Sequence, residues 1–263
     1  MMDVKKISEP PELQVEGYLA RIRLRRPGHA NRLETQDLDV LLDICGRLAA
    51  DKTVRAVVLE SEGKHFSAGF DIRRVAEIAS ATPDGPVHNP FEAVVEAIER
   101  LPQPTIARLH GGVYGGSTDL ALACDFRIGT PATEMFMPAA RLGLLYYPSG
   151  IRRFVARLGV RHAKAMFLLG DRYDAARMLD IGFLDELVPA EKLDPRIEQL
   201  VEQLTSQAPL AVRGAKQAID ALARGDFDLT DFKLREAQTL RSADLSEGAQ
   251  AWAEKRPPRF AGR

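Results

Sequence analysis

Two glycine-containing segments of the chain each follow an apolar, strand-like run. The first segment covers residues 64–72 and follows the apolar run 54–59. The second covers residues 111–117 and lies between the apolar run 105–109 and a helical pattern at 118–123. Glycine permits turns that expose backbone N–H groups, and two such donors can stabilise negative charge that develops on a carbonyl oxygen. The chemistry predicted by these segments is therefore an oxyanion hole made of backbone amides.

The C-terminal residues 247–260 complete a three-part pattern with the two turns. The pattern resembles the enoyl-CoA hydratase/isomerase (crotonase) family, and the similarity runs over nearly the whole chain. The resemblance implies that the carbonyl oxygen of an acyl-CoA thioester lies between the N–H groups of Phe70 and Gly116. Loss of one such donor typically costs about 10²- to 10³-fold in rate. No prosthetic group is implied, and coenzyme A enters as part of the thioester substrate.

Family hydratases use two glutamates to position water and exchange protons, and this chain matches only the first. The first glutamate falls on Asp119, and the second falls on Ala139, which carries no carboxylate. Aspartate is also one methylene shorter than glutamate, and a misplacement of about 1 Å at a reacting centre can cost on the order of 10² in rate. We therefore expect Asp119 to transfer protons but do not expect ordinary two-glutamate hydration. The alternative is that Asp119 only complements the helix dipole.

Two adjacent phenols, Tyr146 and Tyr147, can donate a hydrogen bond or a proton near this position. Residues 142–146 resemble a tyrosine-bearing segment of the family's methylmalonyl-CoA decarboxylases, so Tyr146 is expected to be catalytic. Alternatively, both tyrosines pack at a subunit boundary. The overall prediction is an acyl-CoA enzyme of the enoyl-CoA hydratase/isomerase type, a lyase by reaction class. Decarboxylation and double-bond isomerisation are the alternatives within the family, and a non-catalytic CoA-thioester-binding homologue is the alternative outside enzymes.

Coenzyme A also requires groups that hold its phosphates. Arg25 and Arg26 end the first alternating strand and Arg73 follows the first turn, and the forked donors of arginine suit phosphate. A solvated charged surface explains each arginine pair nearly as well. By the resemblance, further coenzyme A contacts come from the first turn and, across subunits in some members, from the tail: Ala68, Lys255 and Phe260.

Other chemical motifs are weak. Residues 111–116 do not fit GxGxxG and are not followed by Gly-Lys-Ser/Thr, so neither a dinucleotide site nor a P-loop is predicted. Residues 65–69 lack the first glycine of a nucleophile elbow. The five histidines include no HExxH pair, so we expect no metal site.

The composition is that of an ordinary folded enzyme, since 263 residues with 45% hydrophobic content can bury a large core. Lys+Arg 36 against Asp+Glu 37 leaves no basic surplus for nucleic acid or an anionic membrane. Cys45 and Cys124 form no CxxC pair, which fits a reducing compartment. No signal segment opens the chain, and no apolar run approaches the roughly 18 residues that span a bilayer. We therefore expect a cytoplasmic protein without nucleic-acid or membrane partners.

The elements that must position the candidate residues alternate between strand and helix. Residues 18–25 alternate apolar side chains with arginine, as expected for a half-buried strand after a turn at 16–17. Further strands are expected at 54–59, 106–109 and 124–128, and helices at 38–49, 72–79 and 91–101, with a break at 82–86. Helical patterns then dominate, at 152–158, 163–169, 175–179, 195–206, 210–223 and 231–242, with 184–188 as the single expected strand.

This order of elements predicts a layered α/β core followed by a helical module. Periodicity alone does not distinguish such a core from an open doubly wound sheet. The resemblance does, because it implies a crotonase-like spiral of β-β-α units over residues 1–200 and a helical trimerisation module over residues 201–263. A homotrimer or a hexamer of two trimers, acting in fatty acid metabolism, is the expected assembly and role.

Overall fold

The structure is a computed structural model that describes residues 8–80 and 89–263. The break expected at residues 82–86 lies outside the described residues. The described residues form two sheets, and the larger one has six strands. Their spatial order is β1 (Glu9–Glu16), β2 (Leu19–Arg25), β3 (Ala56–Ser61), β4 (Thr105–Arg108), β6 (Phe126–Gly129) and β9 (Glu186–Leu187). The β1–β2 pair is an antiparallel hairpin, and the remaining neighbours are parallel.

A smaller, three-stranded sheet was not expected from the sequence. It consists of β5 (Gly112–Tyr114), β7 (Glu134–Phe136) and β8 (Arg172–Asp174). Strands of three residues are too short to show a period of two, and β8 lies where only helical patterns were expected. The prediction that residues 184–188 hold the single strand after residue 148 is therefore wrong. The chain passes from β4 to β5 and then into α4 (Gly116–Leu122), which is one β-β-α unit.

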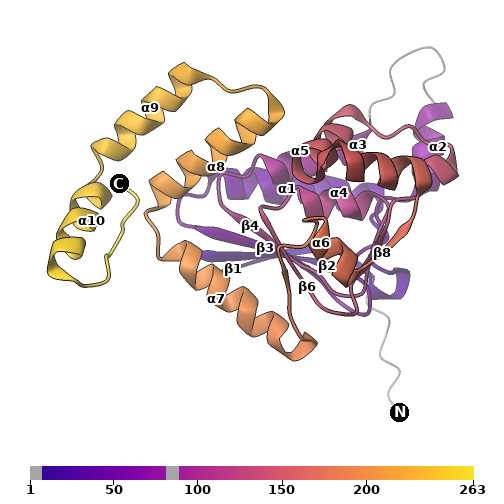
Figure 1. Cartoon of the computed structure of the whole chain (residues 1–263), viewed down its shortest axis with the longest axis horizontal. Helices are drawn as coiled ribbons and strands as arrows, with labels where there is room; N and C mark the ends of the chain where they lie inside the picture. The colour runs from indigo at the N-terminus through magenta and orange to yellow at the C-terminus, as the bar shows by residue number, and fades with distance from the viewer. Residues whose placement is uncertain (1–7, 81–88) are drawn as a thin grey trace.

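Helices cover both faces of the larger sheet (Figure 1). On one face α1 (Thr35–Ala50) and α3 (Pro90–Glu99) pack over Val57 and Leu59 of β3. On the other face α7 (Leu193–Thr205) packs over Ala56 and Val58. Every residue of β3 is buried, as expected for a central parallel strand. This rigid sheet fixes the positions of the two turns that follow β3 and β4.

The remaining elements complete the spiral and the C-terminal module. The α-helices are α2 (Ile72–Ser80), α5 (Pro148–Lys164), α6 (Ala175–Asp180), α8 (Pro209–Arg224), α9 (Leu229–Leu240) and α10 (Ala243–Glu254). The short helices are η1 (Pro27–His29), η2 (Ala140–Leu142), η3 (Ala165–Leu169) and η4 (Ala190–Lys192). The strands expected at 54–59 and 124–128 begin two residues later, at Ala56 and Phe126. Most of the expected helices agree with these bounds to within a few residues, but the helix expected at 152–158 is longer and forms α5 from Pro148 to Lys164.

The last three helices extend away from the sheet, and α10 lies at the opposite end of the molecule from α2 (Figure 1). Two side chains of α8 attach them to the core. Lys216 bonds both carboxylate oxygens of Asp125 at 2.6 and 2.7 Å, and Arg213 donates to the carbonyl oxygen of Val54 at 2.7 Å. Among the helices described, none has the length and apolar character needed to cross a membrane.

Candidate active site

The two glycine turns predicted from the sequence lie against each other. The N–H of Tyr114 donates to the carbonyl oxygen of Ser67 at 2.9 Å, and the hydroxyl of Ser117 donates to the same oxygen at 2.7 Å. A β-carbon built on Gly69 would lie 2.7 Å from the backbone nitrogen of Gly116. Gly69 also has φ of +79°, a left-handed conformation that favours glycine. Close contact of two backbones therefore explains the glycine at this position.

The N–H groups of Phe70 and Gly116 are both available to a ligand. Within residues 8–80 and 89–263, neither donates to an acceptor in the protein. Gly116 is the first residue of α4, where helical N–H groups have no partner within the helix. A β-carbon on Gly116 would lie 2.7 Å from the ring of Phe91, so a side chain there would have to displace that ring. The arrangement offers two free donors at the positions predicted for an oxyanion hole.

Both donor residues line a cavity of about 550 Å³. The wall beside them is aromatic: the rings of Phe70 and Phe91 stack at 6.0 Å, and Tyr146 and Tyr147 stack at 4.2 Å. Apolar residues from the segment after β7 complete this part of the wall, namely Phe136, Met137, Ala139, Leu142 and Leu144. An apolar wall beside the two donors can exclude water from a reacting thioester.

Asp119 is not part of this cavity wall. Its side chain is fully buried behind the two tyrosines. The hydroxyl of Tyr147 donates to Asp119 Oδ2 at 2.5 Å, and the hydroxyl of Tyr146 donates to that of Tyr147 at 3.0 Å. On the other side, Arg153 of α5 donates to Asp119 Oδ1 at 2.6 Å. The two tyrosines, rather than Asp119, line the cavity.

Burial and hydrogen bonding change the pKa values of Asp119 and the two tyrosines. Burial raises the pKa of Asp119 above its usual value, although the bonds from Arg153 and Tyr147 oppose that shift. Burial together with the charge of Asp119 raises the pKa of Tyr146 and Tyr147 well above that of free tyrosine. Both phenols therefore stay protonated at neutral pH and act as hydrogen-bond donors.

Ala139 lines the cavity and carries no carboxylate. The one carboxylate among the described lining residues is Asp71. Its oxygens accept bonds from Arg73, and this holds the pKa of Asp71 at about 2. A carboxylate paired in this way is a poor base, so the described part of the cavity wall offers no free carboxylate to activate water.

The structure brings some of the candidate coenzyme A contacts to the cavity and not others. Ala68 and Arg73 line it. Arg26 is buried and forms a two-bond ion pair with Asp37 at 2.8 and 2.9 Å, and Arg25 bonds groups of strand β1. The tail residues do not line the cavity in the same protomer: Lys255 and Phe260.

Three arginines near the site were missed by the sequence analysis. Arg32 and Arg172 line the cavity and add positive charge to that of Arg73. Arg153 is entirely buried and neutralises Asp119. Lone arginines in a chain with 36 basic residues carry no spacing signal, so only their tertiary positions identify them.

Comparisons with known proteins identify the family of the chain. The sequence model of the family described as enoyl-CoA hydratase/isomerase matches residues 14–263. The chain belongs to the enoyl-CoA hydratase/isomerase family. Its activity is therefore that of an acyl-CoA enzyme of the hydratase/isomerase type.

Individual relatives in the family cover most of the chain. The methylglutaconyl-CoA hydratase of Rattus norvegicus mitochondria is 30% identical over 88% of this chain and 76% of its own length. The enoyl-CoA isomerase/hydratase fer4 of Mycosarcoma maydis is 32% identical over 80% of this chain and 77% of its own. The crystal structure of enoyl-CoA hydratase from Bacillus anthracis has a TM-score of 0.85 at 29% identity, covering 97% of this chain and all of that chain. The crotonase-like α/β fold with a helical C-terminal region is thereby confirmed.

Proposed function

We propose that this enzyme forms an enolate of an acyl-CoA thioester and stabilises its oxygen between the N–H groups of Phe70 and Gly116. The observation that supports this most directly is that both donors are free and line one cavity. Negative charge that develops on the thioester oxygen is then stabilised by donors already in place, which need no reorganisation during the reaction. The family's use of acyl-CoA thioesters supports the same assignment.

Tyr147 and Tyr146 exchange the proton with the substrate carbon, and Asp119 acts through them. The hydroxyls form a row from Tyr146 through Tyr147 to Asp119. When Asp119 is protonated, Tyr146 gives its proton to the substrate carbon, Tyr147 passes its own proton to Tyr146, and Asp119 reprotonates Tyr147 and is left as the carboxylate. Burial raises the pKa of Asp119, which favours the protonated form that this role requires. Asp119 thus keeps the role in proton transfer expected from the sequence, without touching the substrate.

Decarboxylation of a malonyl-type thioester is the reaction that this wall suits best. Breaking the bond to CO₂ leaves its electron pair as the enolate, so no base is required, and the enolate carbon then takes one proton from a phenol. Hydration, in contrast, needs a carboxylate to activate water, and Ala139 stands where the family places it. Double-bond isomerisation requires the same phenol group to remove a proton as well as return it.

The test is turnover of methylmalonyl-CoA, a 3-enoyl-CoA and crotonyl-CoA, followed by mass spectrometry of the products. We expect CO₂ loss from the malonyl-type thioester to be the fastest reaction. Fast hydration of crotonyl-CoA would instead show that the missing carboxylate is not needed. Binding of all three thioesters without turnover would favour the non-catalytic homologue and refute the proposal.

The coenzyme A moiety is held at Ala68 and Arg73, with Arg32 and Arg172 as further cations on the same cavity. Lys255 and Phe260 reach a coenzyme A only from a second copy of the chain, because they lie on the C-terminal module. Exposed apolar side chains on that module support a homotrimer or hexamer. They are Ile219, Leu222, Leu229, Leu234, Leu240, Leu245 and Trp252. A cytoplasmic enzyme of fatty acid metabolism fits the composition.

A further inference from the structure

A buried chain of charges continues from the active-site tyrosines to the other side of α3. Arg153 donates to Asp119 Oδ1 at 2.6 Å and to the two oxygens of Glu99 at 2.9 and 3.2 Å. The side chains of Arg153 and Asp119 are fully buried, and that of Glu99 is 5% exposed. Arg152 adds a further bond to Glu99 at 2.8 Å. One guanidinium therefore joins α3, α4 and α5 behind the tyrosine pair.

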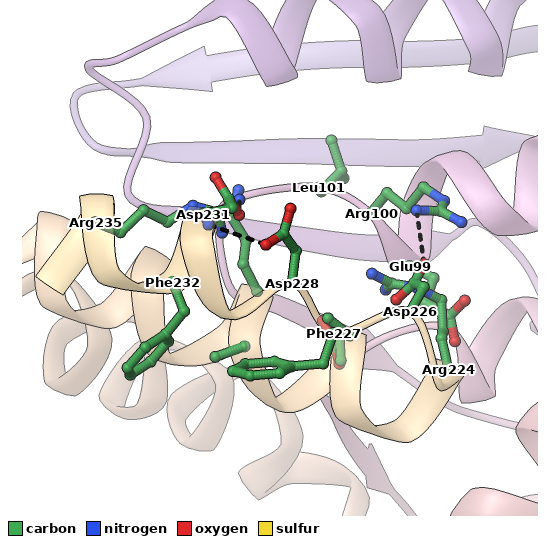
Figure 2. A pocket seen from close by; sticks show the side chains of 14 residues that line it. Glu99, Arg100, Leu101, Arg224, Asp226, Phe227, Asp228, Asp231, Phe232 and Arg235 are labelled. Carbon is green, nitrogen blue, oxygen red and sulfur yellow. Dashed lines mark hydrogen bonds and ion pairs between the residues drawn. The ribbon is translucent and has the colours of Figure 1, made fainter.

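The row of buried charges ends at Glu99, in a polar environment. Glu99 contributes to the wall of a second pocket, which lies between the end of α3 and the α8–α9 turn (Figure 2). Arg100 pairs with Asp226 across this pocket at 3.6 Å. Burial alone would raise the pKa of Glu99, but the bonds from Arg153 and Arg152 outweigh it and lower the pKa to about 2. Glu99 is consequently a fixed negative charge at neutral pH.

Opposing charges act on Asp119 from every helix packed against it. Arg153 on α5 favours the ionised form of Asp119, whereas Glu99 on α3 disfavours it. The phenols of Tyr146 and Tyr147 bond the same carboxylate from the loop before α5. Burial works against the charge of Arg153, but its two carboxylate partners prevail and raise its pKa, so the guanidinium stays charged.

We propose that Arg153 and Glu99 are positioning residues of the acid–base group: Arg153 holds the Asp119 carboxylate against Tyr147, and Glu99 sets how much of the Arg153 charge acts on it. This inference rests on the proposed proton transfer by the phenols. The two residues act in opposite directions, since Arg153 attracts the negative charge of Asp119 and Glu99 repels it.

The experiment measures the pKa of Asp119 directly, in the folded protein without substrate. The protonated-carboxyl band is titrated by infrared spectroscopy and is assigned by its loss in Asp119→Asn. We expect Glu99→Gln to lower the Asp119 pKa by roughly one unit and Arg153→Gln to raise it, since charge partners within a few ångströms shift a pKa by about 1–3. Unchanged or parallel shifts in the two folded variants would overturn the proposal.

Matched controls and a turnover measurement complete the test. Glu96→Gln on α3 and Arg161→Gln on α5 each remove one charge of the same sign from the same helices. Neither residue bonds Asp119, Arg153 or Glu99, so the pKa read from the infrared band should not change. If Arg153→Gln does not fold, Arg153→Lys replaces it: the ammonium keeps the charge, so the Asp119 pKa should stay nearer that of the wild type than in any neutral variant. The acid limb of the pH–kcat profile should move with the infrared pKa. Infrared shifts without any thioester turnover would refute only the proposed function, whereas turnover without opposed shifts would refute this inference.

Discussion

At the scale of single residues, Gly116 is the strictest test of the oxyanion site. Proline at Gly116 removes the N–H but suits the first position of a helix, so α4 should still form. We expect Gly116→Pro to lower kcat by at least about 10². Gly116→Ala is the matched control, because its β-carbon meets the same Phe91 ring but its N–H remains. Equal activity losses in the two folded variants would attribute the effect to the displaced ring and not to the lost donor.

Ala139 tests the reaction subtype. Ala139→Glu places a carboxylate in the cavity wall and should raise crotonyl-CoA hydration about tenfold, because an unsupported glutamate realises only part of the ~10²–10⁴ contributed by a well-placed acid–base group. Ala139→Gln keeps the size without the charge and should give no gain. Adding Asp119→Asn should abolish the gain if both carboxylates serve one step. The rates are measured at steady state. A wild-type kcat for crotonyl-CoA hydration above about 10 s⁻¹, which is ordinary for an enzyme, would contradict the prediction that hydration lacks a carboxylate.

At the scale of elements, the segment between β2 and α1 uses Arg26 for structure. Its ion pair with Asp37 is buried, and breaking such a pair typically costs about 3–5 kcal/mol. We expect Arg26→Gln to lower the free energy of unfolding by about that amount and to leave the KM for the thioester unchanged. Arg73→Gln should instead raise the KM and leave the free energy of unfolding unchanged, because Arg73 is 71% exposed and lines the cavity. A raised KM in a fully stable Arg26→Gln variant would restore Arg26 as a phosphate ligand.

The junction of α3 and α5 predicts a pH dependence of stability. Arg153 and Arg152 lower the pKa of Glu99 from 4.5 to about 2, so the stabilisation is present above pH 4.5 and is lost as pH falls toward 2. That difference corresponds to about 3 kcal/mol at neutral pH. Glu99→Gln should therefore be less stable than wild type at pH 7, with the gap narrowing below pH 4.5. Urea unfolding at several pH values measures this, and a gap that stays constant with pH would contradict the ion-pair explanation.

At the scale of the whole molecule, the C-terminal helices leave apolar side chains without partners in the protomer. Leu222 and Leu234 are 63% and 68% exposed on α8 and α9. Monomers rarely expose such apolar groups together, so we expect a trimer or hexamer by light scattering at micromolar concentration. Leu222→Asp should dissociate it, whereas Val15→Asp, at a half-exposed position on β1, should not. A monodisperse wild-type monomer would refute the assembly.

The order of residues was enough to predict the fold family and the two glycine turns. Gly69 and Gly116 stand where a β-carbon would strike the facing turn or the Phe91 ring, so backbone sterics leave a signal that sequence can carry. The absence of the second carboxylate at Ala139 was equally visible. Hydrophobic periodicity located most helices because each buries one continuous face.

The contacts of the polar groups could not be predicted from the sequence and became visible in the folded structure. The small sheet of β5, β7 and β8 arises from long-range pairing between strands too short to show a period. Asp119 lies behind the tyrosines because Arg153, 34 residues further along the chain, draws it into the protein interior. Arg26 forms an ion pair with Asp37. This arginine, which was expected to contact coenzyme A, therefore stabilises the first turn of α1 instead. Charge pairing depends on distances in space, which the order of residues does not contain.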